Sequence, residues 1–114
     1  MKIDFIEPWV AVGSERASLE EELRRELSPD NALSGFNVQA IGRRVDCDDV
    51  LFEVCDKKAD FKLALVHLTW SGKIESILWP TTKLFANAEE FISNQMMPYV
   101  QDYEYFLKNE RIQE

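Results

Sequence analysis

The segment from Leu63 to Pro80 limits what this chain can fold into more than any other. It reads LALVHLTWSGKIESILWP: an apolar run, a short polar turn, and a second apolar run that ends at a proline. This pattern predicts two antiparallel strands joined by a tight turn. A three-residue loop at Trp70–Gly72 places Leu68 opposite Ile74 and keeps one face of the hairpin apolar. We prefer this register because a buried face fixes how strands pair.

The other face of this hairpin carries a candidate polar or ligand-binding cluster, His67, Thr69, Trp70 and Glu75. His67 is the only histidine, and the register places it opposite the Glu75 carboxylate, which suits a general base. Thr69 points the same way in this register, but no Gly-x-Ser-x-Gly elbow or Cys-His framework supplies an activated nucleophile. We therefore expect a structural cross-strand pair and assign no catalytic residue.

The same face also carries a candidate interface of four large apolar residues, Leu63, Leu65, Ile77 and Trp79. Two arrangements are open for them. Either the N-terminal segment around Trp9 folds over these side chains, or they stay exposed. In the second arrangement they bind another protein or close a symmetric dimer.

Helices are expected on both sides of this region in the sequence. Ser18 begins a capping box, and Pro29 ends the helix that follows it. Its apolar stripe is Leu19, Leu23 and Leu27, and its outer face is expected to be solvated. Asn87 caps a C-terminal helix whose phase continues across Pro98, so the helix is either kinked there or followed by a second one.

Two more strands are expected over residues 36–45 and 50–55. Alternation in the first strand slips beside Gly42, which predicts a β-bulge. The sequence thus predicts one α+β domain over residues 1–114. Its sheet is a four-stranded antiparallel meander, with the N-terminal helix and the C-terminal helical region packed on one face.

The charge balance restricts the partners of this domain. The net charge is −8 at pH 7, which argues against binding to nucleic acid or to an anionic membrane surface. Two readings remain, a charge that only maintains solubility and an acidic face that docks a basic partner. No apolar run approaches the roughly 20 residues of a membrane span. Charges interrupt the N-terminus where a signal peptide is apolar, and Cys47 and Cys55 form no ligand cluster, so we expect a cytoplasmic protein with reduced thiols.

Asp46, Asp48 and Asp49 form an acidic turn that could suggest a divalent cation. A calcium loop also needs further alternating ligands, a glycine at its bend and a distal glutamate, and these are missing. We expect neither a metal nor a cofactor.

Three motifs resemble a known group of sequences: LEEELRREL at residues 19–27, DDVLFE at 48–53, and ALVHLTWSGK at 64–73 followed by Trp79-Pro80. They are similar to a family of small, stand-alone bacterial proteins with no assigned function. The resemblance implies a bacterial, single-domain, cytoplasmic protein, and it brings no catalytic residue with it.

The leading expectation is a non-enzymatic, acidic protein–protein interaction module of immunity or regulatory type. Small size, acidity and the missing catalytic motifs favour this interpretation. Two alternatives stay open. One is a small ligand-binding domain or enzyme with a pocket near His67, and the other is a self-associating homodimer.

Overall fold

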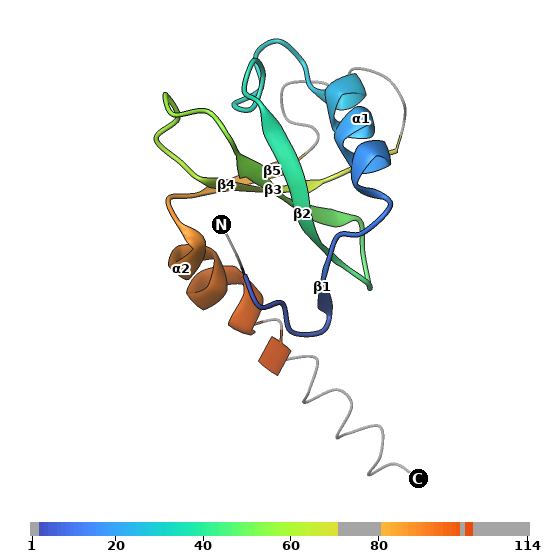
Figure 1. Cartoon of the computed structure of the whole chain (residues 1–114), viewed down its shortest axis with the longest axis vertical. Coiled ribbons are helices and arrows are strands. Elements are labelled where there is room, and N and C mark those ends of the chain that lie inside the picture. Colours follow the sequence, from blue (N-terminus) through green and yellow to red (C-terminus); the bar gives the residue numbers. More distant parts are fainter. Residues whose placement is uncertain (1–2, 71–80, 99, 102–114) are drawn as a thin grey trace, which may run out of the picture.

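The computed structural model of the chain describes residues 3–70, 81–98 and 100–101. The elements in chain order are β1 (Trp9–Ala11), α1 (Arg16–Glu26), β2 (Val38–Arg44), β3 (Asp49–Val54), β4 (Leu63–His67), β5 (Thr81–Phe85), α2 (Ala88–Phe91) and a π-helical turn, η1 (Ile92–Met96). The strands form one antiparallel sheet in the order β1–β2–β3–β4–β5 (Figure 1). The α+β class is therefore confirmed, with five strands in place of the four expected.

The partner of β4 differs from the predicted one. β4 lies between β3 and β5, and its register with β5 pairs Leu63 with Phe85 and His67 with Thr81. Both edges of β4 are thus occupied, so the predicted pairing of residues 63–67 with residues 75–79 is wrong. The region 71–80 itself lies outside the described residues. Phe85 gives a physical reason for the observed pairing, because its buried ring packs edge-on against Phe91, with 5.5 Å between ring centroids.

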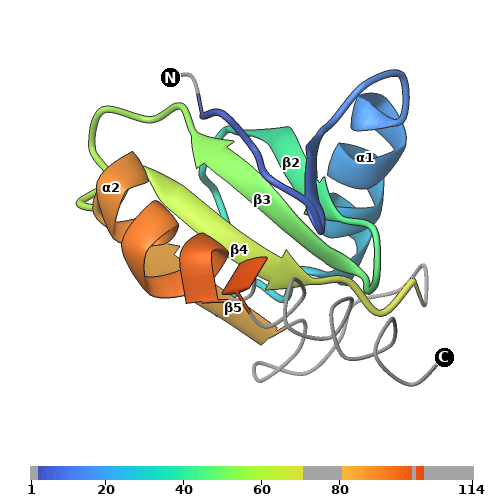
Figure 2. The ribbon, with the colours of Figure 1, turned by 90° about the horizontal axis from the view of Figure 1, so that it is seen from below.

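The two helices cover opposite faces of the sheet, not one face as expected (Figures 1 and 2). α1 packs through Leu19 and Leu23 on the face that contains Phe52, Ala64 and Val66. The C-terminal helical region packs through Phe91 and Met96 on the other face, which contains Leu51, Leu63 and Leu65. The reason lies in the central strands: consecutive residues of β4, Leu63 to Val66, are all buried, so both faces of the sheet need a cover.

The N-terminal segment completes the cover of the second face. Trp9 is buried and packs edge-on against Phe91, with 5.2 Å between centroids. Leu63 and Leu65 are buried in the same cluster, so these two residues are not an exposed interface. The first of the two expected arrangements, in which the segment around Trp9 folds over these side chains, is therefore confirmed for Leu63 and Leu65. Ile77 and Trp79 lie outside the described residues.

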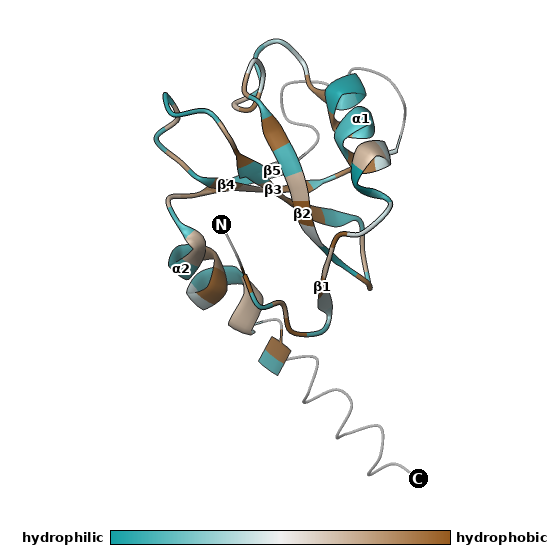
Figure 3. Cartoon of the chain, in the orientation of Figure 1, coloured by the Kyte–Doolittle hydropathy of each residue, from teal (hydrophilic) through white to brown (hydrophobic). Residues whose placement is uncertain are grey.

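Several local predictions from the sequence are confirmed. The register of β2 against β3 shifts between Ala40 and Gly42, which confirms the bulge. Asn87 caps α2, its Oδ1 accepting the Glu90 N–H at 2.8 Å. Leu19 and Leu23 of the predicted stripe are buried on α1, whereas Leu27 follows the end of the helix and is only partly buried. The helix begins at Arg16, and Ser18 does not cap it. Figure 3 shows that much of the rest of α1 is polar, and Leu19 and Leu23 are the residues that α1 contributes to the buried apolar core on this face.

Gly42 allows the ring of Phe5 to approach the backbone of β2 more closely than any other residue at position 42 would. A Cβ atom at this position would lie 2.4 Å from Cζ of Phe5, far inside van der Waals contact. The ring of Phe5 belongs to the N-terminal segment and packs against the second-face core. The bare backbone of Gly42 is therefore the surface on which this segment rests.

Within the described residues, no helix has both the length and the apolar character needed to cross a membrane.

Candidate functional site

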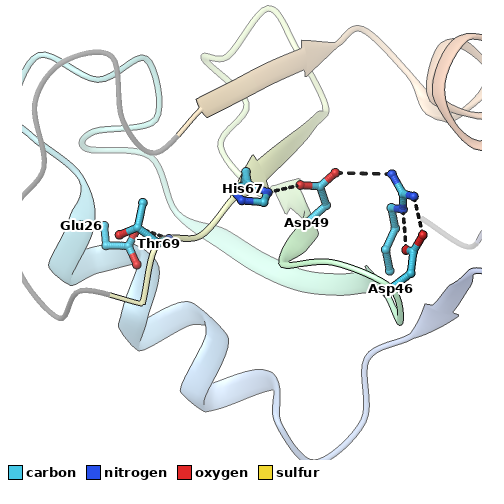
Figure 4. A network of polar contacts seen from close by, with 6 residues as sticks. Glu26, Asp46, Asp49, His67 and Thr69 are labelled. Atoms are coloured by element: carbon cyan, nitrogen blue, oxygen red, sulfur yellow. Dashed lines mark hydrogen bonds and ion pairs between the residues drawn. The ribbon is translucent and has the colours of Figure 1, made fainter.

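Exposed polar and aromatic groups gather where β4 ends and where β2 turns into β3. We call this surface the β4 end and define it by residues 44–49 and 67–70. Figure 4 shows its two polar networks, one on each side of β4. One network joins His67 to the β2–β3 turn, and the other joins the residues after β4 to helix α1.

The first network crosses three strands. His67 and Asp49 lie directly opposite each other in the β3–β4 register, and Nδ1 of His67 is 2.7 Å from Oδ1 of Asp49. The other Asp49 oxygen is 3.9 Å from Nη1 of Arg44. The Nε and Nη2 atoms of Arg44 each donate a hydrogen bond to Asp46. The Arg44 guanidinium lies over the Trp9 ring, 5.6 Å from its centroid.

The carboxylate partner of His67 in the described structure is thus Asp49. The predicted partner, Glu75, lies outside the described residues. A cross-strand pair with a carboxylate was expected for His67, and counting the β3–β4 register as well as the hairpin would have pointed to Asp49. The His67 side chain is 47% exposed, which leaves its outer edge open to solvent.

Thr69 and Trp70 form the second network with Glu26 of α1. The N–H groups of Thr69 and Trp70 donate to the two oxygens of Glu26, at 2.9 and 2.8 Å. The Thr69 side chain is also hydrogen-bonded to Glu26. It therefore turns toward α1 while His67 contacts Asp49, so the expectation that these two side chains share a face is wrong (Figure 4). β4 ends at His67, and the alternation of a strand does not extend past its end.

Trp70 has an unusual backbone conformation. Its φ is +58°, in the left-handed region that a bulky residue rarely adopts, and such a conformation costs about 1–3 kcal/mol. Despite its size, Trp70 is 48% exposed. The two hydrogen bonds to an ionisable carboxyl group stabilise this arrangement, since such bonds are stronger than neutral ones.

Glu26 is an unexpected feature of this site, because its side chain is fully buried. Burial raises its pKa, and the hydrogen bond with the Glu22 carboxyl raises it further, against the lowering effect of the Thr69 and Trp70 donors. Glu22 is buried as well, with its Oε1 3.6 Å from Nη1 of Arg25. A solvated outer face was expected on this helix, and neither glutamate was singled out from the sequence. Their spacing carried the signal, because Leu19, Glu22, Leu23 and Glu26 follow the i, i+3, i+4, i+7 pattern of one helix face.

A small hollow of about 40 Å³ lies beside Trp70. Its lining comes from α1, from β2, β3 and the turn between them, and from the residues after β4: Leu19, Arg43, Cys47, Asp48, Asp49, Val50 and Trp70. Asp49 is engaged by His67, and Arg43 lies 3.8 Å from Glu15. Asp48 is exposed, and its carboxylate makes no ion pair with any residue that the structure describes.

The described residues hold no cluster of metal ligands, and the pKa values of their two thiols are raised. In residues 3–70, 81–98 and 100–101, no three His, Cys, Asp or Glu side chains form a metal-binding group. Cys47 and Cys55 are both free. Burial raises the pKa of each thiol, and neighbouring carboxylates act in the same direction, so neither thiol is activated as a nucleophile.

Comparison of the chain with family models, with curated proteins and with solved structures finds no match. The resemblance to a family of small bacterial proteins stays a prediction.

Proposed function

We propose that this protein is a non-enzymatic, acidic interaction module that binds a basic protein through the β4 end. One observation carries the proposal: a tryptophan is held half exposed, in a strained backbone conformation, by a fully buried carboxyl group. The bonds to Glu26 hold the backbone of Thr69 and Trp70, and the Trp70 ring itself remains half exposed. A fixed and exposed tryptophan is what an anchor for a partner needs.

The position of Trp70 matches what binding hot spots need. Tryptophan is among the residues most enriched at hot spots, where it fills a pocket of the partner. Fixing the backbone in advance lowers the entropy lost on binding. The bonds from Thr69 and Trp70 to Glu26 provide this fixation before any partner arrives.

The β2–β3 turn, which is part of the β4 end, adds further exposed apolar and acidic groups. Val45 is 54% exposed, and its N–H donates to the Pro8 carbonyl oxygen, which brings the exposed Ile6 segment beside it. Asp46 and Asp48 are exposed in the same turn. Apolar anchors with a charged rim are the usual anatomy of an interface. The net charge of −8 would accelerate association with a basic partner at low salt.

Replacing Trp70 by glycine should weaken partner binding about 30-fold, a loss of about 2 kcal/mol. Glycine adopts the left-handed conformation without strain, so the substitution removes the ring and leaves the Glu26 hydrogen bonds in place. The measurement is affinity capture from a lysate of the source organism, followed by titration of the captured protein.

Leu84→Ala is the matched control, because Leu84 is also a large exposed apolar residue and lies on β5. The wild type and Leu84→Ala should capture the same basic protein, and Trp70→Gly should not. Equal capture by all three would contradict the role of the β4 end. Association that does not slow as salt rises would contradict the role of the acidic charge. A mass that grows with concentration in light scattering, with no captured protein, would favour a homodimer instead.

A second candidate function, ligand binding at His67, is favoured by the contact with Asp49. This carboxylate fixes Nδ1 and leaves Nε2 without a hydrogen-bond partner among the described residues. An imidazole oriented by a carboxylate is the arrangement of many general bases.

A thermal-shift screen of metabolites tests this candidate. A true ligand at 100 times its dissociation constant adds about 2.7 kcal/mol to the free energy of unfolding, so the wild type should melt at a higher temperature. The same compound should leave the melting temperature of His67→Gln unchanged. A broad screen without any such compound would remove the candidate.

A further inference from the structure

The hollow beside Trp70 has the walls of a small cation site. Building on the proposed function, we infer that it receives one lysine or arginine side chain of the basic partner. Trp70 supplies an aromatic wall and Asp48 a carboxylate without an ion-pair partner in the described part of the chain. A cation is attracted by both groups, through the face of the ring and through the opposite charge.

The floor of the hollow suits the stem of such a side chain. Leu19 and Val50 line it, and both belong to the buried core between α1 and the sheet. Lysine and arginine cover apolar surface with their methylene groups while the charged head stays near water. Asp48 and Asp49 line the hollow together with Arg43, whose charge is offset by the Glu15 carboxylate 3.8 Å away. The apolar floor and these carboxylates therefore accommodate both parts of the side chain.

Size excludes larger occupants. The volume of about 40 Å³ is far below the roughly 300–1,000 Å³ of pockets that enclose drug-sized ligands. It leaves space for a few atoms, which fits an ammonium group or the edge of a guanidinium. A nucleotide or a folded peptide segment would not fit.

The protein itself contains a filled version of this arrangement. On the other side of the β2–β3 turn, Arg44 lies over the Trp9 ring and donates two hydrogen bonds to Asp46. There the tryptophan, the aspartate and the cation all come from this chain. Beside Trp70 the tryptophan and Asp48 are present, and the partner supplies the cation.

The test is a titration of the ¹⁵N-labelled protein, followed by NMR, with hexa-arginine, hexa-lysine and neutral hexa-glutamine. Both cationic peptides should shift the Trp70 indole signal and the amide signals of residues 47–49, and hexa-glutamine should shift neither. The stronger of the two cationic peptides identifies the preferred head group. Shifts spread evenly over all acidic surfaces would overturn the site.

Asp48→Asn and Asp60→Asn form a charge-matched pair. Each removes one negative charge, but Asp60 is an exposed residue of the loop before β4 and does not line the hollow. Asp48→Asn should weaken peptide binding at least 5-fold, and Asp60→Asn less than 2-fold. Equal weakening would overturn the site in favour of general charge attraction.

Capture of the protein partner separates this inference from the proposed function. If Asp48→Asn retains the partner fully and Trp70→Gly loses it, the interaction module stands and the cation site fails. If both variants retain the partner, both ideas fail.

Discussion

Phe91→Ala should lower the free energy of unfolding by about 3–5 kcal/mol, a large part of the stability of a domain of this size. Phe91 is fully buried and makes edge-to-face contacts with both Trp9 and Phe85. It therefore joins the C-terminal helix to the N-terminal segment and to β5. Its loss leaves a cavity among aromatic rings that cannot easily collapse.

Urea unfolding followed by circular dichroism measures this loss, and Leu84→Ala is again the control. Leu84 is partly exposed on β5, so its truncation should cost less than about 1 kcal/mol. A loss below 1 kcal/mol for Phe91→Ala would contradict the packing of α2 on the second face of the sheet. Such a result would favour the exposed face that the sequence left open.

Glu26→Ala should destabilise the fold by about 2–4 kcal/mol, because two backbone N–H groups, those of Thr69 and Trp70, lose their acceptor in a partly buried site. Glu21→Ala is the matched control on the same helix. Glu21 is exposed and pairs only with Arg25, so its loss should cost about 0.5 kcal/mol or less. Equal effects of the two substitutions in urea unfolding would contradict the support of Trp70 by Glu26.

The same carboxyl group should give the stability a distinct pH dependence. The pKa of Glu26 is raised above its usual 4.5, so the folded state binds more protons than the unfolded state just above that pH. The resulting stability is complete below about pH 4.5 and is lost as the pH rises through the folded-state pKa. Glu26→Gln cannot titrate, so its stability deficit relative to the wild type should shrink as the pH rises from 4.5 toward neutral. A deficit that grows over this range would contradict the raised pKa.

Local signals in the sequence predicted local structure well. The burial of Leu19 and Leu23 on α1, the bulge beside Gly42 and the Asn87 cap all depend on residues within a few positions of one another. The α+β class follows from such elements taken together. Each of these features is decided by backbone geometry that the nearby side chains determine.

Pairing over longer distances could not be obtained in the same way. The apolar run after Gly72 and the segment Thr81–Phe85 both suit a strand beside β4, and only the packing of Phe85 on Phe91 favours the second. The number of covered sheet faces likewise depended on β4, which is apolar on both sides. A short run of consecutive apolar residues fits a strand buried on both faces and a segment of buried helix equally well. The periodicity of such a run therefore does not decide whether one face or both faces of the sheet are covered.

The candidate site was predicted in part. His67 and Trp70 were identified as notable residues, and both lie at the β4 end, where His67 contacts Asp49 and Trp70 contacts Glu26. Glu26 was missed because a glutamate on a charged helix normally faces water. Its burial depends on a partner 43 positions further along the chain, the N–H of Thr69.

The contact between Phe5 and Gly42 has a consequence for how related sequences can diverge. A ring at position 5 leaves no space for a Cβ atom at position 42, whose nearest atom would be 2.4 Å away. The two positions are therefore expected to covary: sequences with an aromatic residue at 5 keep glycine at 42, and sequences with a larger residue at 42 carry a smaller one at 5. A single substitution at either site meets a penalty that the paired change avoids, which makes this an epistatic pair linking the N-terminal segment to the second strand of the sheet.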